Sequence, residues 1–294
     1  MCIRDRSFKQ TIEHATWMTA ATKKSALKKL DLMTERVGYP EHWRNYHGLI
    51  IQRSSFVENV IHAAEFNNQY DLAKIGQPVD RTEWSMAPQT INAYYDPSMN
   101  SMTILAGILQ PPFFDPSAPA AVNYGAIGFV LGHEMTHGFD DQGALFDGEG
   151  NLKNWWTERD MKQFKAATQC IQEQFSHYQV EPGVSVQGKL VVGEATADLG
   201  GILLAYQAFH RSSAYQRAQL IDGFTPDQQF FLGVAHVWAG NIRPEQARSL
   251  VALDPHPPMK YRVNGSLANI PVFQEAYHLK KSGPMVHEPR CVIW

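Results

Sequence analysis

The order of apolar and polar residues predicts a chain built mainly from helices. From residue 7 to 36, apolar positions recur at helical spacing among lysines and good helix formers, until Gly38 and Pro40 break the pattern. Residues 54 to 75 show the same spacing and end before Gly76. We therefore expect one helix in each of these two segments.

An alternating pattern in residues 88 to 106 predicts the small sheet of the molecule. Aromatic and β-branched residues alternate on both sides of the turn-forming sequence DPSMN, which is typical of a β-hairpin. We expect one of its strands to lie at a sheet edge. A proline-rich loop, QPPFFDPSAPAA, follows the hairpin.

The rest of the chain is predicted to form helices joined by turns. Residues 120 to 139 are nearly all apolar and should form a buried helix, whereas 157 to 178 should form an amphipathic one. The stretch VQGKLVVGEATADLGGILLAYQAFH indicates a short strand or loop that enters a helix, and 226 to 239 indicates another helix. The predicted fold class is α+β, predominantly α-helical, with a small edge-strand sheet.

Composition and charge narrow the function classes. With 19% charged residues, 44% hydrophobic residues and a formal net charge of −3, the chain should be globular, and nothing favours nucleic acid as a partner. Apolar runs such as GGILLAY fall short of the roughly 18 residues of a membrane span. The start, MCIRDRSFKQ, lacks the apolar core of a signal peptide, and we expect it to be a truncated beginning.

The apolar segment 120–139 ends in the sequence VLGHEMTHGFDD, which predicts a metal site. On a helix, His133 and His137 share one face and can direct their imidazoles at one zinc ion. Glu134 can then reach a bound water as a general base. An isolated HExxH motif also occurs as an ordinary polar turn of a buried helix, so the interpretation needs a third ligand.

The sequence GEATADLGG supplies that third ligand. Glu194 lies 57 positions after His137 (194 − 137), and Asp198 follows one helical turn later. Glu194 would complete a His₂Glu site with an open position for water, and Asp198 could orient a ligating histidine. A solvated acidic face is the alternative, but the surrounding segment is apolar, and burying two carboxylates there without a cation would be costly.

Together these motifs resemble the neprilysin family of zinc endopeptidases, which includes endothelin-converting enzymes and bacterial oligopeptidase O. The resemblance also rests on NAYYDPSMNSMTILAGILQPPFF, HPPMKYRVNGSL and the terminal CVIW, and it extends over essentially everything after the first six residues. It implies a thermolysin-like, gluzincin-type catalytic domain at 41–294, with 1–40 as a remnant of the helical amino-terminal region and its connecting helix. It also implies one Zn²⁺ per chain.

The resemblance assigns roles to individual positions. His133, His137 and Glu194 match the zinc ligands, Glu134 the catalytic base and Asp198 the partner of a ligand. His256 matches the histidine that stabilises the oxyanion. Arg262 and the edge-strand pair Asn92 and Ala93 match residues that bind the substrate backbone. The positions that match the apolar pocket for the residue after the scissile bond are Ile108, Phe113, Val130, Val237 and Trp238.

The cysteines indicate the cellular compartment of the protein. Family members join the positions matching Cys170 and Cys291 as a disulfide, and Ala239 and Leu279 stand where animal relatives have further cysteines, which suits a bacterial-type member. Disulfides persist in oxidising compartments, so we expect a periplasmic or secreted protein rather than a cytosolic one with two free thiols. The expected partners are oligopeptides and the missing amino-terminal helical domain, and the expected state is a monomer.

The resulting prediction is a zinc endopeptidase that prefers an apolar residue after the scissile bond, with Glu134 as general base. Two other hypotheses stay open. The chain could be a truncated, non-catalytic zinc-binding fragment that acts as a peptide-binding or scaffold domain. It could also carry HExxH by chance, without metal.

Overall fold

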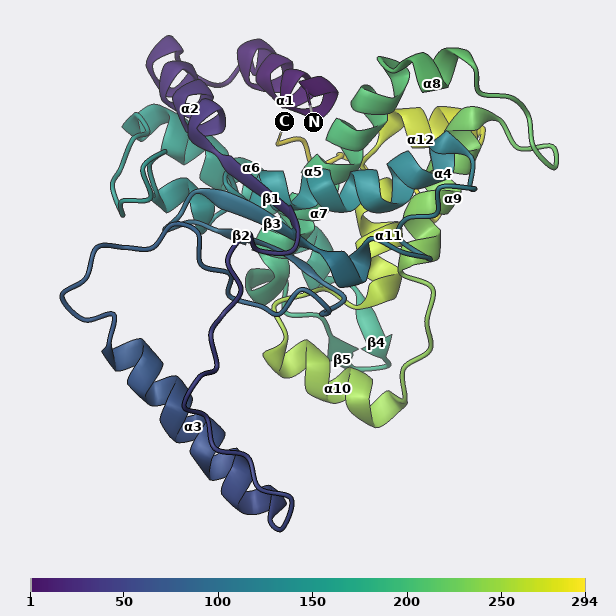
Figure 1. Cartoon of the computed structure of the whole chain (residues 1–294). Helices are drawn as coiled ribbons and strands as arrows, with labels where there is room; N and C mark the ends of the chain where they lie inside the picture. Colours follow the sequence, from purple (N-terminus) through teal and green to yellow (C-terminus); the bar gives the residue numbers. More distant parts are fainter. Residues whose placement is uncertain (1, 294) are drawn as a thin grey trace.

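Two helices, α5 (Phe129–His137) and α7 (Gly188–His210), pack against each other at the centre of the molecule (Figure 1). The computed structural model describes residues 2–293. A Cβ atom added to Gly132 of α5 would lie 2.6 Å from the carbonyl oxygen of Gly201 on α7. One added to Gly201 would lie 2.6 Å from the backbone nitrogen of His133. Glycine at both positions therefore allows the two backbones to approach closely.

The remaining helices, apart from α3, lie around this pair (Figure 1). Their bounds are α1 Cys2–His14, α2 Ala20–Leu32, α3 Phe56–Leu72, α4 Ala120–Asn123, α6 Glu158–Ser176, α8 Ser213–Gln216, α9 Pro226–Val237, α10 Pro244–Leu253, α11 Met259–Leu267 and α12 Pro271–Ala276. A π turn, Tyr124–Gly128, joins α4 to α5, and short 3₁₀ turns lie at Ala106–Ile108 and Gly143–Leu145. The predicted helices at 54–75, 120–139, 157–178 and 226–239 correspond to α3, α4 with α5, α6 and α9.

A three-stranded sheet covers one side of α5. The strands β1 (Thr34–Gly38), β3 (Ser101–Leu105) and β2 (Ala93–Asp96) lie in that order, with β1 parallel and β2 antiparallel to β3. The predicted hairpin is therefore confirmed, and β2 lies at the sheet edge. All five residues of the central strand β3 are buried. A separate two-stranded sheet consists of β4 (Gln179–Glu181) and β5 (Val184–Ser185).

The prediction of one helix over residues 7 to 36 is wrong, because this segment forms α1, α2 and most of β1. The break lies at Thr19, the N-cap of α2. Its backbone nitrogen and its hydroxyl both donate to the buried Asp160 carboxylate of α6, at 3.0 and 2.5 Å. The last residues of the segment pair with β3 instead of continuing a helix. Partners distant in sequence thus override the helical spacing.

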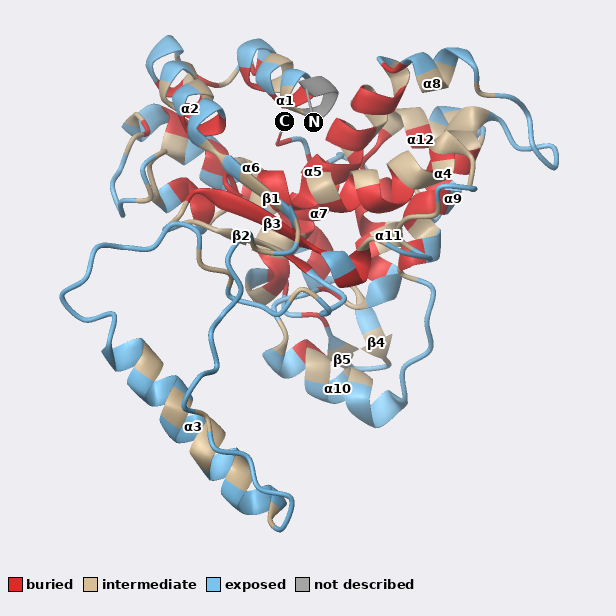
Figure 2. Ribbon diagram, in the orientation of Figure 1, coloured by how far each residue is buried: buried red, intermediate tan, exposed pale blue. Residues whose placement is uncertain are grey.

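Residues 39–91, here called the arm, contain α3, which extends away from the rest of the molecule (Figures 1 and 2). The arm returns to the body at its end, where the nitrogen of Gly107 donates to the carbonyl oxygen of Pro88 at 2.8 Å. Not one of the arm's residues, all of them described, is buried. Phe56 is 82% exposed and Ile75 is 75% exposed. Hydrogen bonds that hold the arm to the body include one from Arg81 to the carbonyl oxygen of Glu149, at 2.9 Å.

The expected disulfide is confirmed: Cys170 of α6 is bonded to Cys291 near the end of the chain. His287 lies beside it, and these three residues form a group with metal-ligating atoms close together, but the disulfide uses both sulfurs. Among the helices formed by residues 2–293, none combines the length and the apolar character that crossing a membrane requires.

Candidate metal centre

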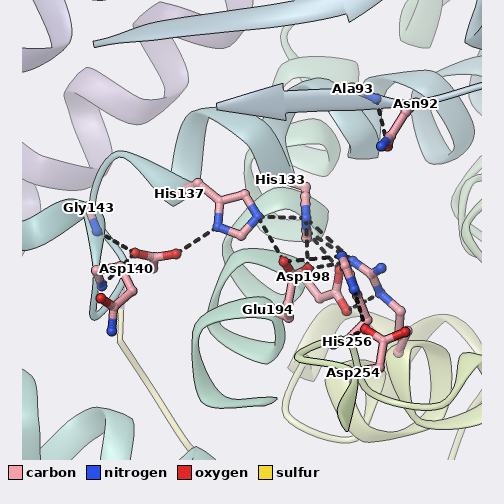
Figure 3. A network of polar contacts seen from close by, with 12 residues as sticks. Asn92, Ala93, His133, His137, Asp140, Gly143, Glu194, Asp198, Asp254 and His256 are labelled. Atoms are coloured by element: carbon pink, nitrogen blue, oxygen red, sulfur yellow. Dashed lines mark hydrogen bonds and ion pairs between the residues drawn. The ribbon is translucent and has the colours of Figure 1, made fainter. Parts of the chain in front are cut away.

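The three predicted metal ligands meet between α5 and α7 (Figure 3). The Nε2 atoms of His133 and His137 are 3.0 Å apart. Oε2 of Glu194 lies 3.3 Å from Nε2 of His133, and its Oε1 lies 3.5 Å from Nε2 of His137. Two side chains one turn apart on α5 and one on α7 thus present three ligand atoms to a single point.

The spacing of these atoms fits zinc. Zinc–nitrogen bonds of about 2.0–2.1 Å in a tetrahedron place neighbouring ligand atoms about 3.3–3.4 Å apart. The three separations here, 3.0 to 3.5 Å, are close to that value. Two imidazoles and one carboxylate are also a donor set found in catalytic zinc sites.

Two carboxylates orient the imidazoles. Nδ1 of His133 donates to Oδ1 of Asp198 at 2.9 Å, and Nδ1 of His137 donates to Oδ2 of Asp140 at 2.7 Å. Because a carboxylate holds Nδ1 of each ring, Nε2 of each ring is directed at the point where a metal ion would bind. Carboxylate–histidine pairs of this kind are the usual outer support of a metal site.

The electrostatics of the site favour a cation. Burial lowers the pKa of the His133 imidazole, but its hydrogen bonds to Asp198 and Glu194 outweigh this effect and raise the pKa to about 10. Burial acts to raise the pKa of Glu194, yet His133, His137 and Arg262 bring it well below its usual range. The negative field that retains a proton on an imidazole also attracts a metal ion in its place.

Glu134 is buried next to the ligands. Its side chain comes from the same turn of α5 and borders the central cleft, and the residue is 6% exposed. Desolvation raises the pKa of its carboxyl group, against the opposing influence of the neighbouring histidines and Arg262. A carboxylate in such surroundings can take up a proton readily.

Arg262 of α11 closes the inner side of the site. Its Nε and Nη2 atoms donate to the two carboxylate oxygens of Asp198, at 2.8 and 2.6 Å, and Nη2 also donates to Glu194 at 3.2 Å. The guanidinium carbon lies 4.0 Å from the ring centroid of Trp238. This two-pronged pairing offsets the buried charge of Asp198 and fixes the side chain that orients His133.

His256 lies on the open side of the centre. Its Nδ1 donates to Oδ1 of Asp254 at 2.7 Å, and its Nε2 is 3.3 Å from Oε1 of Glu194. The side chain is half exposed, so it faces both the ligands and the cleft. Asp254 fixes the orientation of the ring and leaves Nε2 directed at the metal centre (Figure 3).

A cleft of about 740 Å³ opens over the ligands and Glu134. Of the predicted substrate-binding residues, the ones that line it are Asn92, Ala93, Ile108, Phe113, Val130, Trp238 and Arg262. Val237 is buried and is not part of this lining. Asn92 and Ala93 lie at the start of the edge strand β2, where the Ala93 nitrogen donates to the Asn92 side chain at 2.9 Å.

Comparison with protein families also indicates a peptidase. The family model described as Peptidase family M13 matches residues 92–293, and a second model with that description matches residues 5–40. The chain belongs to peptidase family M13. This confirms the resemblance to the neprilysin family, while the predicted domain boundary at residue 40 stays a prediction.

Relatives within M13 include animal proteins. An endothelin-converting enzyme homolog of Locusta migratoria is 38% identical in an alignment of 298 positions that covers 98% of this chain and 41% of the relative. Neprilysin-1 of Caenorhabditis elegans is 39% identical over 98% of this chain and 40% of its own length. The chain thus spans about two fifths of the length of these curated relatives.

Solved M13 structures share the fold. The zinc metalloprotease Zmp1 of Mycobacterium tuberculosis, in complex with an inhibitor, matches with a TM-score of 0.94 and 42% identity, over 100% of this chain and 46% of that one. PepO from Lactobacillus rhamnosis matches with a TM-score of 0.87 and 33% identity, over 98% and 44%. The predicted α-rich zinc peptidase fold is therefore confirmed.

Sequence reasoning missed two carboxylates of this M13 site. Asp140 lies three residues after His137, and Asp254 lies two residues before His256. Both are near a predicted site residue in the sequence, so a search for acidic neighbours of each histidine would have found them. Their pairing still depends on backbone turns: Asp140 accepts hydrogen bonds from the backbone of Gln142 and Gly143.

Proposed function

We propose that this chain is the catalytic portion of a zinc-dependent endopeptidase that hydrolyses peptide bonds in oligopeptides. The observation that carries the proposal is the convergence of His133, His137 and Glu194 at 3.0 to 3.5 Å, with Glu134 buried beside them under an open cleft. Membership of M13 and the likeness to a structure named as a zinc metalloprotease support it.

The three ligands would hold one Zn²⁺. Bound there, the ion supplies Lewis-acid polarisation of a carbonyl and lowers the pKa of a coordinated water to about 7. Glu134 accepts the proton of the attacking water and passes it to the leaving amine, a role that suits its buried carboxyl group. Nε2 of His256, held by Asp254, donates to the carbonyl oxygen as negative charge develops there.

The cleft suggests how a peptide is held. An extended substrate can add itself as a strand along the edge strand β2, where Asn92 and Ala93 contact its backbone. Arg262 holds the substrate carbonyl beyond the scissile bond. Apolar side chains on the cleft wall, Ile108, Phe113, Val130 and Trp238, would favour an apolar residue after that bond.

Replacing Phe113 by Ala should weaken this preference for an apolar residue after the scissile bond. An unchanged preference in a peptide library would contradict the pocket assignment.

The disulfide suggests the cellular compartment in which the enzyme acts. Because disulfides persist in oxidising compartments, a periplasmic or secreted location fits the Cys170–Cys291 bond. We take the chain to act as a monomer together with a helical amino-terminal domain, as the neprilysin-family resemblance implies.

One experiment tests the function directly. Purified chain should contain one zinc ion and cleave members of a short peptide library, and a chelator should remove both properties until zinc is restored. The same assay on the full-length protein provides the reference rate. Zinc binding without cleavage in either protein would favour the non-catalytic scaffold, and absence of zinc would contradict the metal site itself.

A further inference from the structure

Lys29 on α2 is a charged side chain in an almost closed environment. It is 1% exposed, whereas Lys28 beside it is exposed and pairs with Glu149. Burying an ammonium group is costly unless strong partners hold it. Burial lowers the pKa of Lys29 from 10.5 to about 7, against the opposing charges of Asp140 and Asp147. A leucine or methionine would fill the same space without the desolvation cost of a buried charge, which suggests that the ammonium group of Lys29 has a specific role.

The ammonium of Lys29 holds the turn that follows the metal-binding helix. Its Nζ donates to the carbonyl oxygens of Gly143 and Phe146, at 2.7 and 2.8 Å. The ring centroids of Tyr95, Phe139 and Trp155 lie 5.5 to 5.9 Å from the same nitrogen. Lys29 therefore binds this turn through directed hydrogen bonds and stabilises its own charge on aromatic faces.

The same turn carries the partner of a metal ligand. The backbone nitrogen of Gly143 donates to Oδ1 of Asp140 at 2.7 Å, and Oδ2 of that carboxylate accepts from His137. Gly143 also lies against the end of α5, since an added Cβ would be only 1.8 Å from the carbonyl oxygen of His137. A continuous series of contacts thus runs from Lys29 through Gly143 and Asp140 to the His137 imidazole.

We propose that Lys29 is a positioning residue of the metal centre, which sets the orientation of His137 by fixing the Gly143 turn that holds Asp140. It lies in the amino-terminal segment, outside the family match that contains the ligands. The proposal rests on the zinc site of the proposed function. It adds that a helix remote from the ligands in sequence determines how tightly the metal is held.

The test is the zinc affinity of Lys29→Met, measured by chelator competition at a temperature where the protein is fully folded. Changes to the outer support of a metal ligand typically weaken affinity ~10–100-fold, and we expect the lower end of that range. Lys28→Met on the same helix is the matched control and should leave the affinity unchanged. The visible spectrum of bound Co²⁺ should change in Lys29→Met and not in the control.

A double-mutant cycle separates positioning from general stability. If Lys29 acts through Asp140, the double variant Lys29→Met with Asp140→Asn should bind zinc about as weakly as Asp140→Asn alone. Should Lys29→Met fail to fold, Lys29→Leu, which also removes the donor to the turn, takes its place in the same cycle. Unchanged zinc affinity in the single variant, or fully additive losses in the double one, would overturn the proposal.

Failure of this inference is distinguishable from failure of the proposed function. Wild-type chain that binds zinc without cleaving peptides would contradict the hydrolase and leave the affinity comparison intact. If the wild-type chain is active and Lys29→Met binds zinc with the same affinity, only the role of Lys29 would be contradicted. Wild-type chain that binds no zinc would contradict both.

Discussion

The α5–α7 pair and the arm are both helical, but they differ in what surrounds their apolar side chains. Val191 on α7 is 1% exposed, whereas Val57 on α3 is 67% exposed. The hydrophobic core packs around the central pair except where the cleft opens over the ligands, while α3 relies on local contacts such as the hydrogen bond from the Glu58 nitrogen to the Ser55 side chain. Changes in the first region should therefore reach the metal centre, and matched changes in or next to α3 should not.

The largest contrast is expected for two glutamates. Glu134→Gln should lower kcat for peptide cleavage by ~10²–10⁴-fold, because the amide cannot accept the proton, while the zinc content stays the same. Glu58→Gln, the matched change on α3, should leave kcat unchanged. Steady-state kinetics with metal analysis provide the measurement. Retained turnover in Glu134→Gln would exclude this residue as the base.

Two aspartates give the next contrast. Asp198→Ala removes the acceptor for Nδ1 of His133 and should weaken zinc affinity by ~10–100-fold. Asp71→Ala in the arm removes only an exposed partner of Lys74 and should have no effect on the metal. Zinc titration against a competing chelator distinguishes them. Equal affinities in all three proteins would show that Asp198 does not support the ligand.

Two lysines sharpen the comparison through pH. The pKa of Lys29 is about 7 in the folded chain and near 10.5 when unfolded, so between these values the unfolded chain binds more protons and the free energy of unfolding rises with pH. From pH 7 to 9 this amounts to about 2 kcal/mol, and Lys29→Met should lose it. Hydrogen bonds to Glu83 and Asp71 raise the pKa of Lys74, which therefore stays protonated in that window.

Urea unfolding of the zinc-free chain at both pH values provides the measurement for the lysines. Wild type and Lys74→Met should gain stability in parallel as pH rises, and Lys29→Met should gain less. Identical pH dependence in wild type and Lys29→Met would contradict the buried, proton-releasing lysine.

The smallest contrast concerns two valines. Val191→Ala should destabilise the chain by about 1–2 kcal/mol, because it removes buried methyl groups from the core. Val57→Ala should change the free energy of unfolding by less than about 0.5 kcal/mol. The urea midpoints of both variants test this. A larger loss for Val57→Ala would mean that another surface covers the arm in solution.

The same comparison explains how far the fold could be predicted. Helical spacing correctly predicted both α3 and α9, because that signal is local to the segment. The same signal wrongly predicted one helix over 7–36. The hydrogen bonds that fix the break there join Thr19 to Asp160, 141 positions away, and local spacing contains no information on such contacts. Spacing also contains no information on burial, so the exposure of the arm could not be predicted from it.

The candidate site was more predictable than the fold around it. Helix geometry places the side chains of HEMTH on one helix face and those of GEATADLGG on another, so His133, His137, Glu194 and Asp198 could be proposed in advance. That the two faces meet depends on the packing of α5 against α7. Lys29 could not, since four lysines stand close together on α2 and only packing against the Gly143 turn distinguishes one of them.

The paired glycines where α5 meets α7 have a consequence for the geometry of the metal site. Side chains at Gly132 or Gly201 would move the helices apart and widen the gap that the imidazoles and Glu194 share. Without a methyl group at either position, the two helices keep the close separation at which the three ligand atoms lie 3.0 to 3.5 Å apart.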